Sequence, residues 1–219
     1  MIRLVCFAIG YLLGLFQSAF IIGKLNGIDI REHGSGNAGT TNALRVLGTK
    51  IGLLVFAGDL LKAILSIVIV RVFIAPMYPD LKYLLIYYAA FGCILAHDFP
   101  FYMNFKGGKG IAVTAGMILS YHPAFIVMGV ITFFGPFLIT HYVSLGSLLM
   151  YGCFFIQTLI FGILGIFGNL STGNLMEIYI LAALMTGLAY WQHRANIVRL
   201  LKHEESKTYL GKKKEAAAE

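Results

Sequence analysis

Long apolar runs with few charges are the feature that most constrains how this chain can fold. They cover residues 4–22, 51–74, 81–96, 111–140, 145–167 and 175–190. About 20 apolar residues in a helix cross a hydrocarbon core of about 30 Å. Only 12% of the residues are charged and the mean hydropathy is +0.80, whereas a soluble domain has about 25% charged residues. We therefore predict an all-α integral membrane protein.

The run 111–140 is too long for a single crossing, because as one helix it would measure about 45 Å. Pro123 offers a break that gives two helices, the first of them short. The alternative is one kinked helix, since membrane helices tolerate proline. With the break, the sequence predicts seven transmembrane helices.

The distribution of positive charge favours seven crossings over six. Seven crossings place segment 24–50, the glycine loop at 97–110 and the C-terminal end on one side, with most of the 17 lysines and arginines. Six crossings would send the basic C-terminal end outside, against the tendency of positive charge to remain in the cytoplasm. We therefore predict an N-terminus outside and a cytoplasmic C-terminus.

The chain shows no linker or second domain. We predict one polytopic membrane domain over 1–203 and a polar, flexible cytoplasmic tail over 204–219, in the form of a frayed helix. The apolar N-terminus could also be a signal peptide. The length of its run and the lack of a clear cleavage site favour a first transmembrane helix.

Charge and cysteine content exclude several classes of function. The net charge of +7 reflects basic loops next to anionic lipid and does not indicate nucleic acid as a partner. Cys6, Cys93 and Cys153 all lie in apolar runs and form no disulfide framework or metal-binding spacing. We predict no metal site and no cofactor.

The first of three polar segments is 33–48, HGSGNAGTTNALRVLG. Its small residues expose backbone N–H groups, hydroxyls and amides, and Arg45 adds a guanidinium that can bind an oxyanion. A simple connecting loop is the alternative. It leaves Arg45 unexplained, because no acidic partner is near in the sequence.

The second polar segment is the glycine loop, 97–110, HDFPFYMNFKGGKG. Its glycines allow the backbone to approach a ligand closely, and Lys106 and Lys109 add positive charge. A helix beginning near Gly110 would present unpaired N–H groups to an anion. The loop is not a Walker A motif, because Gly110 stands where that motif has Ser or Thr. A charged turn at the membrane surface is the alternative, and His97 could be a base, a hydrogen-bonding partner or a structural residue.

The third polar segment is 190–199, in which His193, Asn196 and Arg199 follow one another at three-residue steps on one helix face. A snorkelling basic helix end is the alternative. Together, the three segments predict clusters of anion donors at one membrane interface, beside lipid-facing walls. Such a site suits a ligand with a phosphate head and an acyl tail. The residues alone leave phospholipid chemistry and transport both open.

At these segments the chain resembles the bacterial acyl-phosphate:glycerol-3-phosphate acyltransferases, the PlsY family. The matching motifs are GSGNAGTTNALRVLG, HDFPFYMNFKGGKG and HRANIVRLL, with a weaker THYVSLGS before residue 148. The resemblance implies transfer of a fatty acyl group from acyl phosphate to the 1-hydroxyl of glycerol 3-phosphate, giving lysophosphatidic acid and inorganic phosphate. It also implies a bacterial inner membrane, an active site at the cytoplasmic face and, as a partner, the enzyme that makes acyl phosphate.

Matching positions in these motifs give the expected site residues. The resemblance implies catalytic roles for Ser35, Arg45, Lys106, His193 and Asn196, and substrate-binding roles for Gly36, Asn37, Thr41, Asn42, His97, Gly107, Gly108, Lys109, Ser144 and Glu205. In this scheme Lys106 and the amides of Gly107 and Gly108 hold phosphate. His203 and Glu204 stand where the family often has Gly-Thr, which leaves the register of the tail open.

The proton of the glycerol hydroxyl could go to His193, to His97 or to the departing phosphate. We favour the phosphate, because neither histidine has an obvious carboxylate partner in the sequence.

Other membrane functions fit less well. A transporter would place polar residues at mid-membrane depth, where only Asp59 and Lys62 are candidates. A CDP-alcohol phosphotransferase needs a cluster of metal-binding aspartates, and the soluble-type glycerolipid acyltransferases have an aspartate five positions after a histidine. The sequence has neither pattern. A purely structural membrane module leaves the 35–45 segment unexplained.

Overall fold

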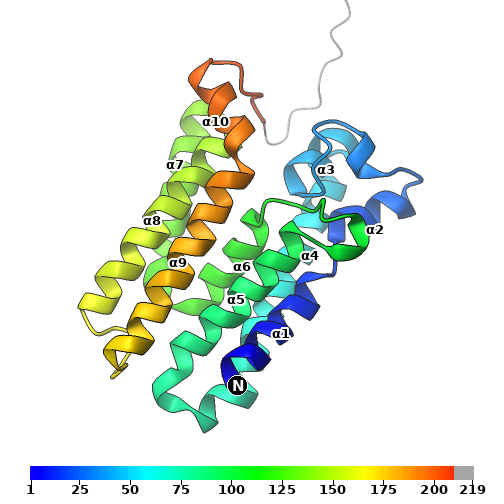
Figure 1. Cartoon of the computed structure of the whole chain (residues 1–219). Helices are drawn as coiled ribbons and strands as arrows, with labels where there is room; N and C mark the ends of the chain where they lie inside the picture. Colours follow the sequence, from blue (N-terminus) through cyan, green and yellow to red (C-terminus); the bar gives the residue numbers. More distant parts are fainter. Residues whose placement is uncertain (210–219) are drawn as a thin grey trace, which may run out of the picture.

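The computed structural model describes residues 1–209, and within this part the chain is helical without any strand (Figure 1). The helices are α1 (Ile2–Gly14), α2 (Ser18–Leu25), α3 (Thr40–Leu47), α4 (Thr49–Ile69), α5 (Lys82–Asp98), α6 (Ile111–Tyr121), α7 (Pro123–Thr140), α8 (Val143–Ile163), α9 (Thr172–Gln192) and α10 (Arg194–Leu201). A π-helical turn, η2 (Val70–Ile74), extends α4, and short 3₁₀ turns lie at Ile30–Glu32 and Phe101–Met103.

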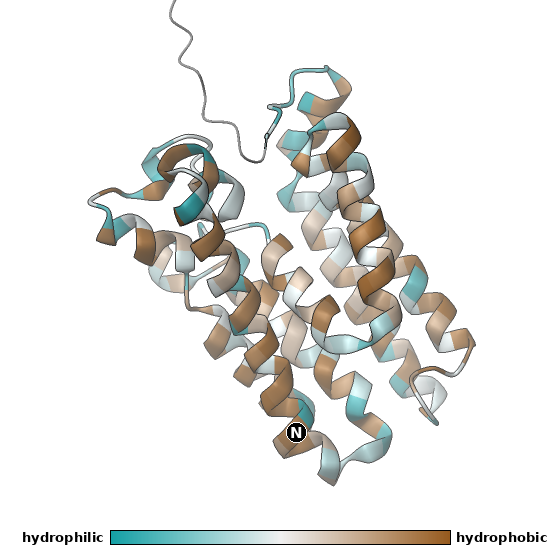
Figure 2. Ribbon diagram, turned by 180° about the vertical axis from the view of Figure 1, so that it is seen from behind, coloured by the Kyte–Doolittle hydropathy of each residue, from teal (hydrophilic) through white to brown (hydrophobic). Residues whose placement is uncertain are grey.

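Six helical segments of residues 1–209 are long and apolar enough to cross a membrane, and α6 is a shorter apolar helix. The break at Pro123 is confirmed, because α6 and α7 are separate helices joined at His122. Helices α1, α4, α5 and α6 pack as one group, and α7, α8 and α9 pack as a second group against α5 and α6. Hydrophobic residues cover the long helices of both groups (Figure 2).

The closest helix pair is α1 with α5. A Cβ atom added at Gly10 would lie 1.8 Å from the carbonyl oxygen of Ala89, and one added at Gly92 would lie 2.2 Å from that of Phe7. The two backbones are therefore in direct contact, an arrangement that small residues permit in membrane helices. This packing makes α5 the central helix, and it delivers His97 and Asp98 to the interior at its C-terminal end.

The first apolar run is not the single helix expected over 4–22. It forms α1 and α2 with a break at residues 15–17. The side chain of Gln17 enters the break and donates to the carbonyl oxygens of Gly14, Ala96 and His97 at 3.1–3.3 Å. The Lys62 ammonium donates to the carbonyl of Phe16 at 2.6 Å. Gln17, in the break itself, and Lys62, from α4, thus bind backbone carbonyls that a continuous helix would have paired with its own N–H groups.

Helix α6 determines how deep the interior site can lie. Its 11 residues span about 16 Å, roughly half of a hydrocarbon core. Its C-terminal end lies far from the polar segments, because the carbonyl of Tyr121 accepts from Arg71 in η2 at 2.9 Å. Helix α6 therefore begins about half way along the bundle, and the preceding loop 99–110 descends to that depth.

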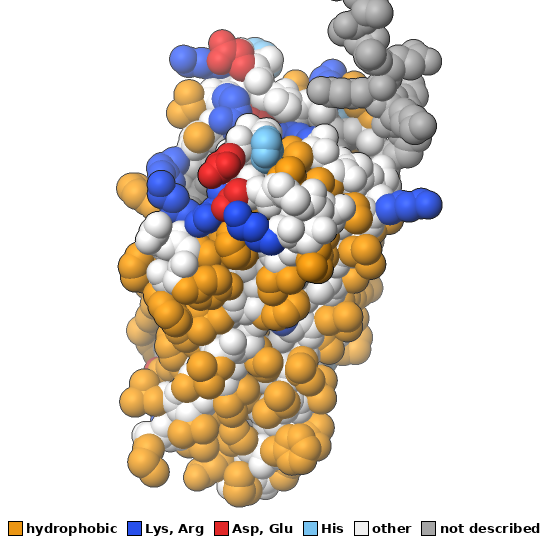
Figure 3. Space-filling model, turned by 90° about the vertical axis from the view of Figure 1, so that its right-hand side faces the viewer, with side chains coloured by type: hydrophobic (Ala, Val, Ile, Leu, Met, Phe, Trp, Pro, Cys, Tyr) orange, Lys and Arg blue, Asp and Glu red, His pale blue; other side chains and the backbone are white. Residues whose placement is uncertain are grey.

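On the face shown in Figure 3, the charged side chains gather at one end of the molecule. This end holds α3, the loop between α5 and α6, and α10, and it lies opposite the N-terminus (Figure 1). The three polar segments, which were expected at one membrane interface, lie together at this end of the bundle.

The segment 204–209 differs from the flexible, frayed helix expected there. It has no helical structure, and the side chains of Glu205 and Thr208 are buried. The backbone N–H of Thr208 donates to the carbonyl of His141 at 2.9 Å, and the ring of Tyr209 packs against that of His141. Contacts with α7 and α8 therefore order this part of the tail. The rest of the predicted tail, 210–219, lies outside the described residues.

Candidate active site

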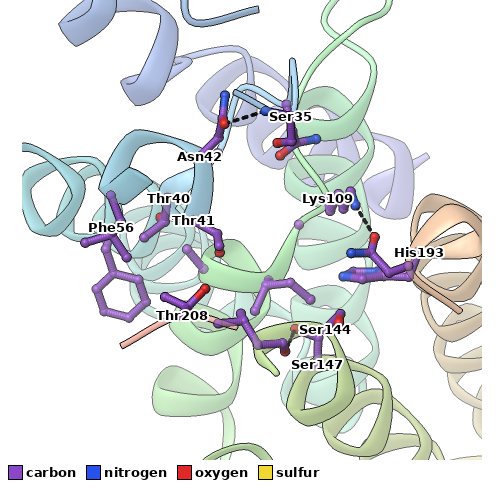
Figure 4. Close-up of a pocket in the computed structure, with 18 of the residues that line it drawn as sticks. Ser35, Thr40, Thr41, Asn42, Phe56, Lys109, Ser144, Ser147, His193 and Thr208 are labelled. Atoms are coloured by element: carbon purple, nitrogen blue, oxygen red, sulfur yellow. Dashed lines mark hydrogen bonds between the residues drawn. The ribbon is translucent and has the colours of Figure 1, made fainter. Parts of the chain in front are cut away.

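A cavity of about 280 Å³ lies where the three polar segments meet. Figure 4 shows that its walls come from distant parts of the chain, with Ser35, Thr41, Lys109, Ser144, His193 and Thr208 around one space. Each of the three segments thus contributes a wall to the same pocket.

Asn42 organises the first segment. Its amide nitrogen donates to the carbonyls of Ile30 and His33 at 3.1 and 2.9 Å, and its oxygen accepts from the N–H of Ser35 at 2.9 Å. These bonds hold Ser35 beside the pocket. Arg45, from α3, reaches the tail and donates to the Ser206 carbonyl at 3.3 Å and to the Thr208 hydroxyl at 3.1 Å.

The first and third segments are both anchored to the glycine loop. The carbonyl of Gly107 accepts from the N–H of Ala38 and from the Asn37 amide, both at 3.3 Å. On the other side, Gln192 donates to the carbonyl of Gly108 at 3.4 Å, and Lys109 donates to Asn196. The glycine loop is therefore the part of the site that the other two segments share.

The phosphate-binding scheme expected for this loop needs two corrections. The N–H groups of Gly107 and Gly108 donate to the carbonyls of Asp98 and His97, both at 3.1 Å. They are therefore used within the loop rather than offered to a ligand. Lys106 lies exposed at the surface and is not part of the pocket wall, whereas Lys109 is. Left-handed backbone at Asn104 and Phe105 (φ 53° and 57°) turns the chain just before Lys106.

Lys109 begins a polar network across the pocket. Its ammonium donates to the oxygen of Asn196, whose amide nitrogen donates to Glu205 Oε1 at 2.8 Å. Glu205 also accepts from Ser144 at 3.0 Å and from Arg199 Nε at 2.7 Å. The buried carboxylate thereby fixes three side chains that face the cavity. Lys109 and Arg199 share the single carboxylate of Glu205, and Arg45 is nearby. The pocket therefore has a net positive charge, which suits an anionic ligand.

Burial, and after it the positive charge of Arg199, lowers the pKa of Lys109 to about 8. Desolvation disfavours the charged form of a lysine, and a neighbouring cation disfavours it further. Lys109 is still mainly protonated at pH 7. An anion in the pocket would relieve both effects.

His193 is held as a hydrogen-bond acceptor. Its Nδ1 lies 2.8 Å from the carbonyl of Ala189, and because a carbonyl only accepts, Nδ1 carries the proton. Burial, and then the charge on Lys109, lowers the pKa of His193 to about 4. At neutral pH the ring is uncharged, and its Nε2 lone pair is available to the pocket.

One wall of the cavity is apolar. It consists of Leu53 and Phe56 on α4 and of Phe133, Phe134 and Phe137 on α7. Leu53, Phe56 and Phe134 are between 36% and 54% exposed, so this wall continues to the outer surface of the bundle. A ligand could therefore place a polar head among the cations and an apolar tail between α4 and α7.

Most of the predicted site residues converge on this pocket. Its lining includes Ser35, Asn37, Thr41, Asn42, Arg45, His97, Lys109, Ser144, His193, Asn196 and Glu205. Gly36, Lys106, Gly107 and Gly108 are not part of it. Gly36 shapes the first segment through its φ of +71°.

Several lining residues were not predicted from the sequence. Ser147 and Thr208 have hydroxyl groups at the pocket, and Asp59 reaches it from α4. The phenylalanines of α7 gave no distinguishing signal, because lipid-facing helices have the same composition. Among residues 1–209, no group of three or more His, Cys, Asp or Glu side chains could hold a metal ion.

The family model of glycerol-3-phosphate acyltransferase matches residues 4–203. The glycerol-3-phosphate acyltransferase of Bacillus subtilis (strain 168) is 38% identical over 202 residues, which cover 91% of this chain and 94% of the relative.

Two solved structures have the same fold. One is the integral membrane glycerol 3-phosphate acyltransferase PlsY (YgiH) in its glycerol 3-phosphate form, at a TM-score of 0.80 and 30% identity, covering 94% of this chain and 96% of that one. The other is its lysophosphatidic acid form, at 0.76 and 29%, covering 94% and 95%. Together with the apolar helices and the shared pocket, these similarities show that the chain belongs to the PlsY family of integral membrane glycerol-3-phosphate acyltransferases.

Proposed function

We propose that this protein transfers a fatty acyl group from acyl phosphate to the 1-hydroxyl of glycerol 3-phosphate, giving lysophosphatidic acid and inorganic phosphate. The observation that supports this most is the joining of a cation-lined cavity and an apolar wall in one pocket. Acyl phosphate and glycerol 3-phosphate both carry a phosphate group, which the cations can bind, and acyl phosphate also has an acyl chain, which the apolar wall can accommodate. A pocket of this mixed kind suits the pair.

Arg45, Lys109 and Arg199 are proposed to bind the two phosphate groups. Two anions repel each other strongly when they approach in a low-dielectric site, and fixed cations offset that repulsion. Arg45 is well suited to this role because its present partners, the Ser206 carbonyl and the Thr208 hydroxyl, are neutral. A phosphate oxygen would replace them as a stronger, charge-assisted acceptor.

The acyl chain is proposed to lie against Leu53 and Phe56 of α4 and the three phenylalanines of α7. Because this wall reaches the lipid-facing surface, the donor could enter and the product could leave sideways, without its chain crossing water.

The proposed reaction needs no covalent enzyme intermediate. The 1-hydroxyl oxygen of glycerol 3-phosphate attacks the acyl carbonyl carbon, and the bond from that carbon to the phosphate oxygen breaks. The hydroxyl proton passes to the departing phosphate. His193 is proposed to accept the hydroxyl hydrogen bond through Nε2 and so to orient the nucleophile. Its lowered pKa, about 4, makes it a weak base at neutral pH.

For the site residues we propose substrate-binding and catalytic roles for Ser35, Asn37, Thr41, Arg45, Lys109, Ser144, His193 and Asn196. Asn42 and Glu205 are proposed to position them through the hydrogen bonds described above. Lys106 is not retained in the mechanism, because it lies outside the pocket.

For topology we propose seven crossings, in which the short helix α6 makes one of them. The N-terminus would then be outside, and the active site would face the cytoplasm of a bacterial inner membrane. That side is where the family's proposed partner, an enzyme that makes acyl phosphate, would deliver the donor. The concentration of basic residues at the pocket end supports this orientation.

The donor assignment can be tested with purified protein in nanodiscs supplied with glycerol 3-phosphate. We expect lysophosphatidic acid and inorganic phosphate in equal amounts with acyl phosphate and no product with acyl-CoA, because a coenzyme A leaving group is far larger than a cavity of about 280 Å³ that also holds glycerol 3-phosphate. Product formed from acyl-CoA alone would refute the proposed donor.

Lys109 and Lys106 form a matched pair, three positions apart in the same loop. Lys109→Met should lower kcat/KM for glycerol 3-phosphate at least a hundredfold, about 2.7 kcal/mol, because it removes a cation from the pocket. Lys106→Met should change it less than about threefold. Steady-state phosphate release measures both. A larger loss of kcat/KM in Lys106→Met than in Lys109→Met would show that Lys106, and not Lys109, binds the substrate.

The pH dependence should follow Lys109. Its pKa of about 8 means that the binding cation is present below pH 8 and is lost above it, so kcat/KM should fall as pH rises from 8 to 10. Lys109→Arg should remain active and should move that fall to higher pH, because arginine stays protonated. A fall at the same pH in Lys109→Arg and the wild type would assign it to another group.

A further inference from the structure

A second polar cluster lies directly beneath the glycine loop, and the proposed reaction does not use it. It consists of Asp59 and Lys62 on α4, His97 at the end of α5, and Ser18 at the start of α2. Asp59, Lys62 and His97 are between 1% and 5% exposed. Ionisable residues at this depth are costly to bury and tend to have a function.

The Lys62 ammonium is surrounded by acceptors. It lies 3.0 Å from Asp59 Oδ1 and donates to the carbonyls of Phe16 and Gly14 at 2.6 and 3.3 Å. Its remaining neighbour is His97 Nδ1, at 2.9 Å. A protonated lysine has only donors. Nδ1 must therefore accept this bond, which leaves the proton of a neutral His97 ring on Nε2.

The Nε2 edge of His97 lies against the glycine loop, at the wall of the active site. A Cβ atom added at Gly108 would lie 2.1 Å from Nε2, so this edge is directly against the residue that precedes Lys109. His97 is part of the pocket wall, and among residues 1–209 its Nε2 has no hydrogen-bond partner. An N–H group on this edge would lie at the pocket wall, next to the space where the phosphate is proposed to bind.

We propose that Lys62 is a positioning residue, which holds His97 in the tautomer that offers Nε2–H to a phosphate group of the substrate. This inference rests on the proposed function, because it takes the pocket to be the phosphate site. His97 is then a further phosphate donor, and Asp59 balances the charge of Lys62. The two histidines of the pocket have opposite tasks: His193 accepts through Nε2, and His97 donates through Nε2.

The arrangement also screens the substrate from Asp59. This carboxylate belongs to the pocket wall and would repel a phosphate if it stood alone. Its Oδ1 accepts from Ser18 at 2.9 Å and from Lys62. The pair is neutral as a whole, so the cations of the upper pocket determine the sign of the field there.

The first test reads the tautomer without any need for activity. The full-length protein is labelled with ¹⁵N-histidine. The ring signals of His97 are assigned as those that disappear from the spectrum of His97→Gln. We expect the proton of His97 on Nε2, with Nδ1 bare, and a change of the Nε2–H signal when inorganic phosphate is added. A proton on Nδ1, or an Nε2–H signal that phosphate leaves unchanged, would overturn the proposal.

The second test uses two amides in place of the imidazole. The amide nitrogen of His97→Gln lies near the position of Nε2, and that of His97→Asn near Nδ1. We expect His97→Asn to raise KM for glycerol 3-phosphate about tenfold, as the loss of one hydrogen bond to a charged group predicts, with kcat changed less than about threefold. His97→Gln should keep KM within about threefold of the wild type. Equal effects of the two would contradict a donor at Nε2.

The third test asks whether Lys62 acts through His97. Lys62→Met is made together with Asp59→Asn, so that no buried charge is left unpaired, and this double change is introduced into the wild type and into His97→Gln. It should raise KM about tenfold where His97 is present and less than about threefold where glutamine replaces it, because an amide has no tautomers. Equal effects in both backgrounds would show a purely structural ion pair. If the double variant does not fold, the ¹⁵N spectrum of the wild type decides.

Failure of this inference and failure of the proposed reaction can be told apart. A protein that turns over acyl phosphate but carries the His97 proton on Nδ1 keeps its function and refutes the role of Lys62. A protein that shows phosphate contact at His97 Nε2–H but makes no lysophosphatidic acid keeps the phosphate site and refutes the reaction.

Discussion

Every backbone group that this fold takes below the membrane surface must find its partner inside the protein, because lipid offers none. The site depends on two places where the chain leaves its helices at that depth. The glycine loop pairs its own N–H groups with the end of α5, and the break between α1 and α2 is closed by Gln17 and Lys62. Both solutions meet at His97, whose carbonyl accepts from Gln17 and from Gly108.

This constraint explains why glycine is needed in the loop. A side chain at Gly107 would meet the carbonyl of His97 at 2.0 Å, and one at Gly108 would meet the His97 ring. The glycines therefore let the loop pack tightly under the pocket, and the work of binding an anion falls to side chains. Lys109, Asn196 and Arg199, which we propose bind that anion, form a rigid network around Glu205, and such a network would need little reorganisation when a charged ligand arrives.

Much of the fold follows from local properties of the sequence. Apolarity and length gave the long helices and the break at Pro123, and the clustering of glycine, asparagine and basic residues gave the polar segments. Which residues share a face is also local information, so His193 and Asn196 were expected together and are found together. The break at 15–17 is not local, because its partners Lys62 and Ala96 come from other helices.

Two errors at the site have the same origin. Lys106 and Lys109 are chemically alike, but Gly107 and Gly108 between them are bonded to the carbonyls at the end of α5, and only Lys109 lines the pocket. The composition of the polar tail predicts flexibility, yet contacts of Thr208 with His141 and Arg45 hold this residue at the cavity. In both cases hydrogen bonds to distant parts of the chain, and not composition, decide which residue reaches the cavity.

The central claim is that three segments, far apart in sequence, meet on one side of the membrane. Its most direct test is labelling of single cysteines with a membrane-impermeant maleimide, in intact cells and in inverted vesicles. The positions are the exposed residues Ser35, Lys106 and Lys202, with Ser171 before α9 as the opposite end and the unaltered chain as background. The account predicts that the first three react only in inverted vesicles and Ser171 only in intact cells. Reaction of Ser35, Lys106 and Lys202 from different sides would contradict a shared pocket.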